Sequence, residues 1–242
     1  RGSGGVVGSE VGSREGGRVA GPRKRPGERG DGAGLARERF GAASRGAGEA
    51  RALALRLQAA VRGERDALLA WYDASRRDLP WRRTRDPYAV WISEAMLQQT
   101  RVETAIPYWH RFLERFPDVA TLASAELEEG YELWAGLGYY MRARNLSRAA
   151  QAVMQRFGGE LPDDVEALRS LPGIGRYTAG AVASIAFDRQ EPVVDGNVER
   201  VLARRLGLRT NVKAPETAKQ IWQEALQLAR GPRPGDLNQA LM

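Results

Sequence analysis

The sequence predicts an all-α protein, and three observations support this prediction. From Glu64 onward, apolar residues recur at intervals of three or four positions, which is typical of helices that pack on a core. Short polar or Pro/Gly connections such as Phe116-Pro117-Asp118 separate these segments. The one strand-like run, Pro192-Val193-Val194, is too short for a sheet, and no repeat of fixed period is present. We therefore expect about eight to ten helices and no βαβ units.

The first 48 residues are predicted to form a disordered basic tail. Residues 1–60 contain 12 Arg or Lys against 6 Asp or Glu, and they hold 15 of the 28 glycines. A segment so rich in glycine and poor in apolar residues cannot bury enough surface to offset the entropy of ordering. Its run Pro22-Arg23-Lys24-Arg25-Pro26 can bind phosphate weakly, although a solvated linker is the more common meaning of such a run.

Helical segments then follow one another along the chain. Leu53, Leu57 and Val61 have helical spacing, so a helix can already begin near Arg51. Asp86 is suited to cap a helix that starts at Pro87. The other segments with helical spacing are 68–72, 106–116, 122–137, 143–157, 165–168, 179–187, 198–206 and 217–228.

The composition excludes several classes of chemistry. The chain has no cysteine, so it holds no disulfide, no thiol nucleophile and no cysteine-ligated metal. Its single histidine, His110, excludes a multi-histidine metal site and makes a Ser-His-Asp triad improbable; we expect it on a helix surface. No apolar run approaches about 20 residues and no secretory signal opens the sequence, so we expect a soluble intracellular protein. Residues 61–242 carry 25 Arg or Lys and 24 Asp or Glu, so most of the +7 charge lies in the tail.

A glycine-rich turn between two helices is the first motif with chemical meaning. No strand precedes it and no Gly-Lys-Ser/Thr follows, so it is neither a dinucleotide fingerprint nor a Walker loop. Glycines let a backbone approach a ligand closely, and the N–H groups that begin a helix attract anions. A plain helix–helix turn is the alternative. The full string Leu171-Pro172-Gly173-Ile174-Gly175-Arg176-Tyr177-Thr178-Ala179 resembles the helix–hairpin–helix element, which holds one DNA strand by its phosphates.

Two carboxylates are candidates for catalysis. Glu94 has Val90, Trp91 and Leu97 at i−4, i−3 and i+3, so it lies on an apolar face where burial would raise its pKa. An acid that leans into solvent or pairs with Arg101 is an equally good interpretation. Asp195 precedes a helix, and N-capping is its stronger interpretation. The same position also allows a carboxylate to face a cleft and stabilise a developing cation.

Together these strings resemble the N-terminal catalytic region of MutY-type adenine DNA glycosylases, in the helix–hairpin–helix base-excision superfamily. The resemblance covers about residues 62 to 242. Besides the hairpin, the matching strings are Leu79-Pro80-Trp81-Arg82, Trp91-Ile92-Ser93-Glu94-Ala95-Met96-Leu97-Gln98-Gln99-Thr100, Leu133-Trp134-Ala135-Gly136-Leu137-Gly138-Tyr139-Tyr140, Val194-Asp195-Gly196-Asn197-Val198 and Asn238-Gln239-Ala240-Leu241-Met242.

The resemblance implies two helical subdomains with a cleft between them. Residues 49–82 would pack with the C-terminal subdomain, residues 83–187 would form a six-helix-barrel-like subdomain that contains the hairpin at 165–183, and residues 188–242 would form the second, incomplete subdomain.

It also implies roles for individual residues. Glu94 would protonate adenine, Asp195 would stabilise the sugar cation, and Tyr177 and Asn197 would lie near the sugar and the water. Trp81, Arg82 and Gln239 would line the adenine pocket, and Gln99 and Tyr139 would enter the base stack. The set expected to hold the DNA backbone is Gly173, Gly175, Arg176 and Thr178.

Such enzymes hydrolyse the glycosidic bond of an adenine that is flipped out of the duplex opposite 8-oxoguanine or guanine. Double-stranded DNA is thus the expected partner, for a monomer that binds no membrane and resides in the cytoplasm with the nucleoid, or in the nucleus or mitochondria. Relatives usually continue into four cysteines that hold a [4Fe-4S] cluster and into a lesion-recognition domain; these ligands are absent here. Two alternatives remain: an endonuclease III-type lyase, which carries lysine where this chain has Tyr177, and a non-catalytic DNA-binding module.

Overall fold

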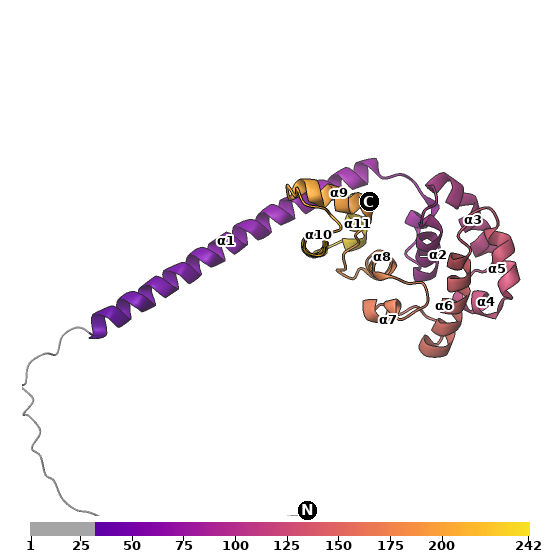
Figure 1. Cartoon of the computed structure of the whole chain (residues 1–242), viewed down its shortest axis with the longest axis horizontal. Coiled ribbons are helices and arrows are strands. Elements are labelled where there is room, and N and C mark those ends of the chain that lie inside the picture. The colour runs from indigo at the N-terminus through magenta and orange to yellow at the C-terminus, as the bar shows by residue number, and fades with distance from the viewer. Residues whose placement is uncertain (1–31) are drawn as a thin grey trace, which may run out of the picture. The chain divides into compact units, whose positions relative to one another are not determined.

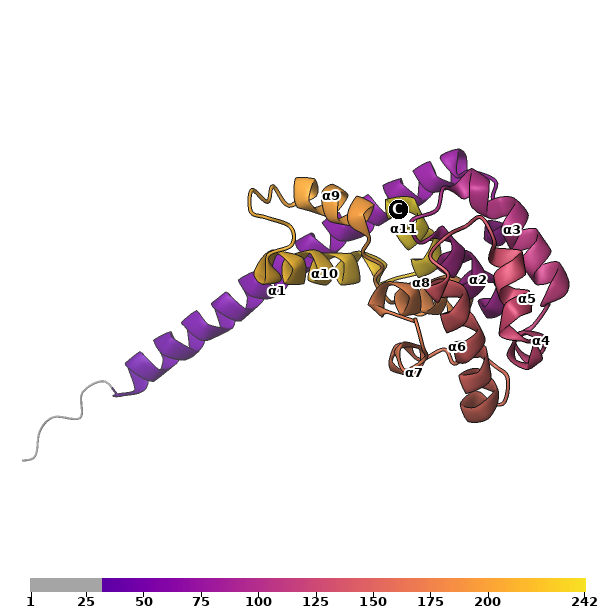
Figure 2. The same cartoon turned by 45° about the vertical axis from the view of Figure 1, so that its right-hand side comes forward.

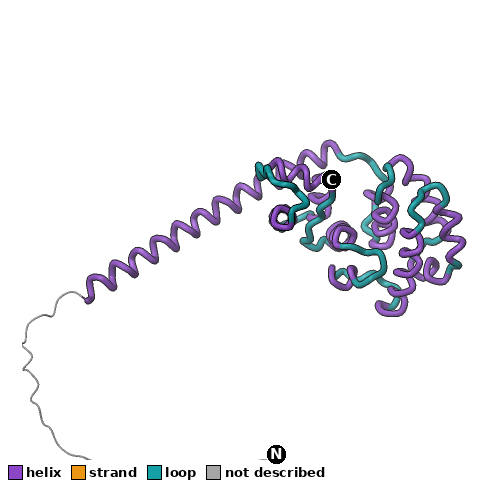
Figure 3. Tube along the Cα trace, viewed as in Figure 1, coloured by secondary structure: helices purple, strands orange, loops and turns teal. Residues whose placement is uncertain are grey.

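The computed structural model describes residues 32–242, and every regular element in this range is helical (Figures 1 and 3). The predicted all-α fold is confirmed, with eleven α-helices and one 3-10 helix in that range. They are α1 (Gly32–Ser75), η1 (Pro80–Arg83), α2 (Pro87–Leu97), α3 (Val102–Arg115), α4 (Val119–Ser124), α5 (Leu127–Trp134), α6 (Met141–Phe157), α7 (Val165–Arg169), α8 (Arg176–Phe187), α9 (Gly196–Arg205), α10 (Pro215–Ala229) and α11 (Pro234–Leu241).

The N-terminal part differs from the expected tail. The chain divides into two units, residues 1–52 and 53–242, and α1 crosses the boundary between them. Residues 32–48 are helical in the structure, where disorder is the prediction from the sequence. Alanine, arginine and glutamate are strong helix formers, and they alternate with the glycines in this segment. Residues 1–31, which include the run Pro22-Arg23-Lys24-Arg25-Pro26, lie outside the described residues.

The segment expected to form one helix over 122–137 is two helices. The Asp118 side chain caps α4 by accepting the Thr121 N–H at 2.7 Å. Ala125 and Glu126 then adopt extended backbone conformations, with ψ of 151° and 144°, before α5 begins. Helix α11 was not expected; Pro234 occupies its first turn, where its missing N–H costs nothing.

Two hydrophobic cores organise residues 53–242. The first is built from α2 to α8 with η1 and ends at Val193. The second starts at Val194 and joins α9, α10 and α11 to Leu69 of α1. Segment 188–195 therefore passes from one core to the other; Asp188 and Arg189 lie at the surface, while Val193 and Val194 are buried in the two cores.

Helix α8 lies at the centre of this arrangement, in contact with α2, α7 and α11 (Figures 1 and 2). Its fit depends on small residues. A Cβ atom on Gly180 would lie 2.5 Å from the Pro192 carbonyl oxygen, and one on Gly235 of α11 would lie 2.5 Å from the Ser184 carbonyl oxygen. These close contacts fix α8, including its first residue Arg176, relative to both cores. Among the described helices, none combines the length and the apolar character that crossing a membrane requires.

Candidate active site

A cavity of about 220 Å³ lies where the two cores meet, and it gathers seven residues that the sequence analysis selects. They are Trp81, Arg82, Glu94, Tyr177, Asp195, Asn197 and Gln239. The remaining wall is mainly apolar and comes from η1, α2, α8 and the residues around them. A small cavity with converging polar groups is typical of a site that receives one small ring system.

Glu94 is the buried acid of this cavity. It lies on α2 among eight other buried residues and is itself only 6% exposed. Burial raises its pKa to about 7, the nearby Tyr177 hydroxyl and Arg82 lower it, and Asp195 raises it. Its Oε2 atom has no hydrogen-bond partner among the described residues. Of the two interpretations from the sequence, burial is therefore correct and pairing with Arg101 is not.

Asp195 occupies a position that is compatible with both interpretations of the sequence. Its carboxylate accepts the backbone N–H of Asn197 at 2.9 Å and that of Val198 at 2.8 Å, which makes it the N-cap of α9. The same side chain lines the cavity. The helix start thus holds a partly exposed carboxylate at the wall opposite the core that carries Glu94.

Tyr177, on the first turn of α8, lies beside Glu94. Its hydroxyl donates to the sulfur of Met242 at 3.2 Å, and burial raises its pKa above the ordinary value. The Asn197 amide donates to the Met242 carbonyl oxygen at 3.3 Å and to Asp195 at 3.3 Å. Both groups are neutral at physiological pH, so they serve as hydrogen-bonding and packing groups beside the acids.

Trp81 and Arg82 form the wall that η1 contributes. Trp81 is buried and packs edge-on against Trp109, with ring centroids 6.1 Å apart, so it belongs to the core as well as to the cavity. The Arg82 guanidinium lies 5.5 Å from the centroid of the Tyr72 ring and donates to the Arg77 carbonyl oxygen at 3.3 Å. Stacking and hydrogen bonding leave Arg82 held beside the cavity.

Gln99 and Tyr139 lie outside the cavity, and both have unusual backbones. Their φ angles are 58° and 49°, in the left-handed region that few residues other than glycine adopt. Both side chains are exposed, and Tyr139 is 63% exposed although it is a large aromatic residue. Strain of this kind persists only where neighbouring structure enforces it, and it marks functional positions.

The glycine-rich turn joins α7 to α8 and supplies the N-terminus of α8. Gly173 has φ of 76°, and a Cβ atom there would lie 2.6 Å from the Asn145 Cβ, so this glycine is required by the fold. Gly175 is the N-cap of α8 with an ordinary φ of −84°, and a Cβ there would meet no atom within 4 Å. Gly175 therefore faces open space, and any demand for glycine at this position comes from a ligand.

The two side chains that follow in this motif lie in different environments. The Arg176 guanidinium stacks over the Trp222 ring of α10, 3.5 Å from its centroid. Thr178 is only 3% exposed, and its hydroxyl accepts a bond from the Gln98 amide at 3.4 Å. The Thr178 side chain is thus buried, because α8 turns it toward α2; its expected backbone contact can come only from the N–H at the helix start.

Sequence reasoning missed Asn238, which organises the site without lining it. It is 1% exposed, and its amide group donates to Ser184 Oγ at 2.9 Å and to the Glu191 carbonyl oxygen at 2.8 Å. Its Oδ1 accepts the Val193 N–H at 3.4 Å. Three segments are joined by this one amide, which places Asp195 and Gln239 at the cavity. No local pattern in the sequence distinguishes Asn238 from a solvated polar residue. His110 is exposed on α3, as predicted.

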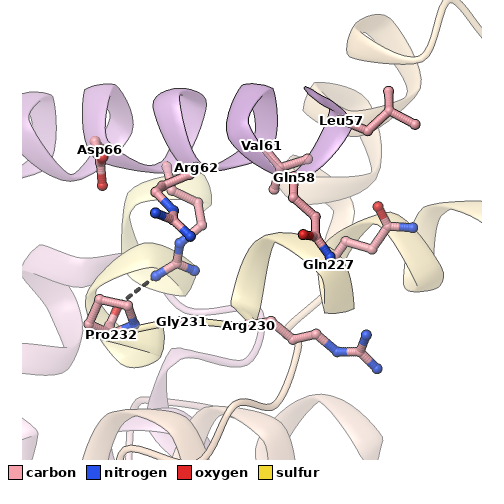
Figure 4. Close-up of a pocket in the computed structure, with 10 residues that line it drawn as sticks. Leu57, Gln58, Val61, Arg62, Asp66, Gln227, Arg230, Gly231 and Pro232 are labelled. Atoms are coloured by element: carbon pink, nitrogen blue, oxygen red, sulfur yellow. Dashed lines mark hydrogen bonds between the residues drawn. The ribbon is translucent and has the colours of Figure 1, made fainter. Parts of the chain in front are cut away.

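A larger cavity of about 780 Å³ lies elsewhere, between residues 57–66 of α1 and the end of α10 (Figure 4). The Arg65 guanidinium is buried there and donates to the carbonyl oxygens of Leu228 and Pro232. The only acidic residue that lines this larger cavity, Asp66, is exposed on α1. The larger cavity therefore lacks the buried acid that distinguishes the smaller cavity.

The residues present do not fit an iron–sulfur cluster. Thiolate ligands are the usual requirement of such clusters, and the 242-residue chain contains no cysteine. Within residues 32–242, no group of three or more His, Asp or Glu side chains is placed to bind a metal ion.

Comparison with known proteins gives a consistent family. Residues 92–227 match the family model described as HhH-GPD superfamily base excision DNA repair protein. The chain is 49% identical over 193 residues to the adenine DNA glycosylase of Homo sapiens, covering 76% of this chain and 35% of that protein. It is 45% identical over 204 residues to that of Arabidopsis thaliana, covering 74% and 32%. The chain thus spans about a third of the length of these curated relatives.

Solved structures share the fold. A thermostable thymine-DNA glycosylase superposes with a TM-score of 0.69 at 30% identity, over 75% of this chain and 84% of that one. A trapped endonuclease III–DNA covalent intermediate superposes with a TM-score of 0.62 at 23% identity, over 76% and 84%. The predicted helix–hairpin–helix glycosylase fold is confirmed.

Proposed function

We propose, from the premise that this chain belongs to the HhH-GPD superfamily of base excision DNA repair proteins, that it is a monofunctional adenine DNA glycosylase. The relatives in Homo sapiens and Arabidopsis thaliana bear that name. The single observation that carries the proposal is the buried Glu94, whose pKa is raised, in a cavity that also contains the Asp195 carboxylate. Two carboxyl groups in unlike environments are what the hydrolysis of a glycosidic bond requires.

Glu94 would act as the general acid. With a pKa of about 7, a large fraction of Glu94 is protonated at neutral pH, whereas a solvated glutamate has lost its proton. Glu94 lines the cavity and its Oε2 has no hydrogen-bond partner among the described residues, so the carboxyl proton would be available to a ring nitrogen of a flipped adenine. Protonation makes the base a better leaving group, and the electron pair of the sugar–base bond departs with it.

Asp195 would stabilise the sugar cation that this departure creates. Its carboxylate is fixed by two backbone N–H groups of α9, so it needs no rearrangement as charge develops. Asn197 and Tyr177 lie beside it and would orient the sugar and the attacking water. Water then adds to the sugar, which leaves free adenine and an abasic site in DNA.

Tyr177 separates this reaction from strand cleavage. A lyase of this superfamily needs an amine at the sugar to form an imine, and a phenol cannot supply one. Lys213 and Lys219, the lysines of the described range, do not line the cavity. Glycosidic hydrolysis without an imine intermediate is the chemistry that these residues support.

The partner would be duplex DNA with adenine opposite 8-oxoguanine or guanine, bound by a monomer. Gly173 and Gly175 would bring the backbone N–H groups of the α8 start to a phosphate, and Arg176 would add a charge beside them. Gln99 and Tyr139 would enter the base stack that the flipped adenine leaves. A protein with this substrate would work wherever the cell keeps its DNA.

Single-turnover excision with the full chain in excess tests the proposal. Duplexes that contain adenine opposite 8-oxoguanine, guanine or thymine are incubated with the protein, and abasic sites are revealed by hot alkali. We expect cleavage only after alkali, fastest opposite 8-oxoguanine and slowest opposite thymine. Strand breaks without alkali would indicate a lyase, and binding without abasic sites would indicate a DNA-binding module.

A further inference from the structure

Arg142 connects two segments of the surface that carry the left-handed residues Gln99 and Tyr139. It lies in the first turn of α6, directly after the segment 135–140. One terminal nitrogen, Nη1, lies within hydrogen-bond distance of the carbonyl oxygens of Ala95, Met96 and Gln98, at 3.1, 2.9 and 2.6 Å. The other, Nη2, donates to the carbonyl oxygens of Leu137 and Gly138, at 3.2 and 3.1 Å.

The contacts on the α2 side stop that helix. Ala95 and Met96 belong to its last turn, where carbonyl groups lack partners within the helix. A guanidinium placed there satisfies them and complements the negative end of the helix dipole. Gln98 then leaves the helix with ψ of 109°, and Gln99 takes its left-handed φ.

The contacts on the α6 side hold the second segment in the same way. The dipole of α6 does not stabilise Arg142, because a cation in the first turn of a helix faces the positive end of the dipole. Its guanidinium carbon instead lies 5.3 Å from the Trp134 ring centroid and 5.5 Å from that of Tyr139. The side chain is directed toward the segment that presents Tyr139. These contacts explain why an arginine occupies the first turn of α6.

We propose that Arg142 is a positioning residue that holds Gln99 and Tyr139 as one rigid pair for entry into the DNA base stack. The entry of the pair into the base stack rests on the proposed function, whereas the connection of the two segments by Arg142 does not. Two other described residues with left-handed φ, Asp188 and Arg233, have ion pairs of their own, with Arg85 and with Asp73. Arg142 instead contacts Gln98 and Thr100, on either side of Gln99, and lies near the Tyr139 ring.

Lysine is the informative substitution. Arg142→Lys keeps the charge, but one ammonium group cannot reach both sets of carbonyl oxygens as a planar guanidinium does. Arg148→Lys is the matched control: it lies on the same helix, is exposed and has no polar partner among the described residues. The two variants lose the same guanidinium from the same helix, and only one loses the connection.

Hydrogen exchange without DNA tests the structural part. In Arg142→Lys we expect faster amide exchange in both segments, 97–101 and 135–141, and no change in Arg148→Lys. Faster exchange in one segment only, or in neither, would overturn the proposal. If Arg142→Lys does not fold, the pair is tested in the native chain by combining Gln99→Ala with Tyr139→Ala. We expect the double variant to differ from the product of the two single effects on DNA unstacking. If the effect of the double variant equals that product, the two residues act independently and the proposal of a shared support is contradicted.

The functional part is read with 2-aminopurine placed beside the target adenine. We expect Arg142→Lys to reduce unstacking and single-turnover excision by about tenfold to a hundredfold, because a small misplacement has that effect. The pH profile of excision should keep its midpoint, since Arg142 does not contact Glu94; a shifted midpoint would indicate general damage to α2 and overturn the proposal. If the native chain excises no adenine, the proposed function fails, and the exchange experiment still decides the role of Arg142.

Discussion

The Asp195 carboxylate accepts a hydrogen bond from the backbone N–H of Asn197 at 2.9 Å, and the same Asp195 side chain lines the cavity that contains Glu94. One side chain therefore caps α9 and carries the proposed catalytic role. This coincidence lets the two roles be separated, because asparagine caps helices as well as aspartate does but carries no charge.

We predict that Asp195→Asn slows adenine excision by about 10²–10³-fold and leaves the free energy of unfolding nearly unchanged. Asp195→Ala should lose a similar factor in rate and, in addition, about 1 kcal/mol of stability, because the cap is lost. Single-turnover kinetics and urea unfolding of both variants check this. An Asp195→Asn protein of native activity would leave Asp195 only its capping role.

The raised pKa of Glu94 predicts the pH dependence of excision. A general acid acts in its protonated form, so the rate should fall as pH rises through about 7. Glu94→Gln should lower the rate by about 10²–10⁴-fold at neutral pH and retain DNA binding. Single-turnover rates from pH 5 to 9, with binding measured in parallel, test both statements. A native-like rate in Glu94→Gln would remove this residue from the mechanism.

The same pKa makes Glu94 a source of pH-dependent stability. Its folded-state pKa lies above the ordinary value of 4.5, so the folded protein holds a proton that the unfolded chain releases between pH 4.5 and 7. Stability is unaffected below that interval and falls as pH rises through it, by about 3 kcal/mol in total. Glu94→Gln should be the more stable protein at pH 8 and should lose that advantage at pH 4. Equal stability of the two proteins at pH 8 would contradict the assigned burial cost.

Lysine in place of Tyr177 should introduce covalent chemistry. The site is buried, and burial lowers the pKa of a lysine, which leaves a larger share of it as the nucleophilic amine. Tyr177→Lys incubated with abasic DNA and borohydride should give a trapped complex, whereas the native chain and Tyr177→Phe should not. Absence of a trapped species with bound DNA would show that this side chain does not reach the sugar.

Much of the site could be predicted because its signals are local. Glu94 is flanked within one turn by Val90, Trp91 and Leu97, so its burial follows from helical spacing. Asp195 stands directly before a helix, and both its capping and its position at the cavity follow from that place in the chain. The seven residues that meet at the cavity come from strings that the sequence displays intact.

What the sequence did not predict depends on contacts between distant segments. Asn238 bonds to Ser184, 54 positions away, and Arg142 reaches Ala95, 47 positions away. Neither residue has a local pattern that distinguishes it from a solvated polar residue. The division of 122–137 into α4 and α5 was missed because apolar spacing continues across Ala125 and Glu126, while their backbone does not remain helical.

The two glycines of the hairpin permit the sharpest test of DNA contact. A side chain at Gly175 meets no protein atom within 4 Å, and threonine begins a helix about as well as glycine, so Gly175→Thr should fold normally. It should nevertheless weaken duplex binding by about tenfold to a hundredfold at low salt, because it blocks hydrogen bonds from the α8 start to a phosphate. Gly173→Thr is the contrast: its φ of 76° and the nearby Asn145 Cβ should destabilise the fold itself by about 1–3 kcal/mol. Fluorescence anisotropy with duplex DNA and thermal unfolding distinguish the two. Normal binding by a folded Gly175→Thr protein would show that the phosphate does not approach this turn.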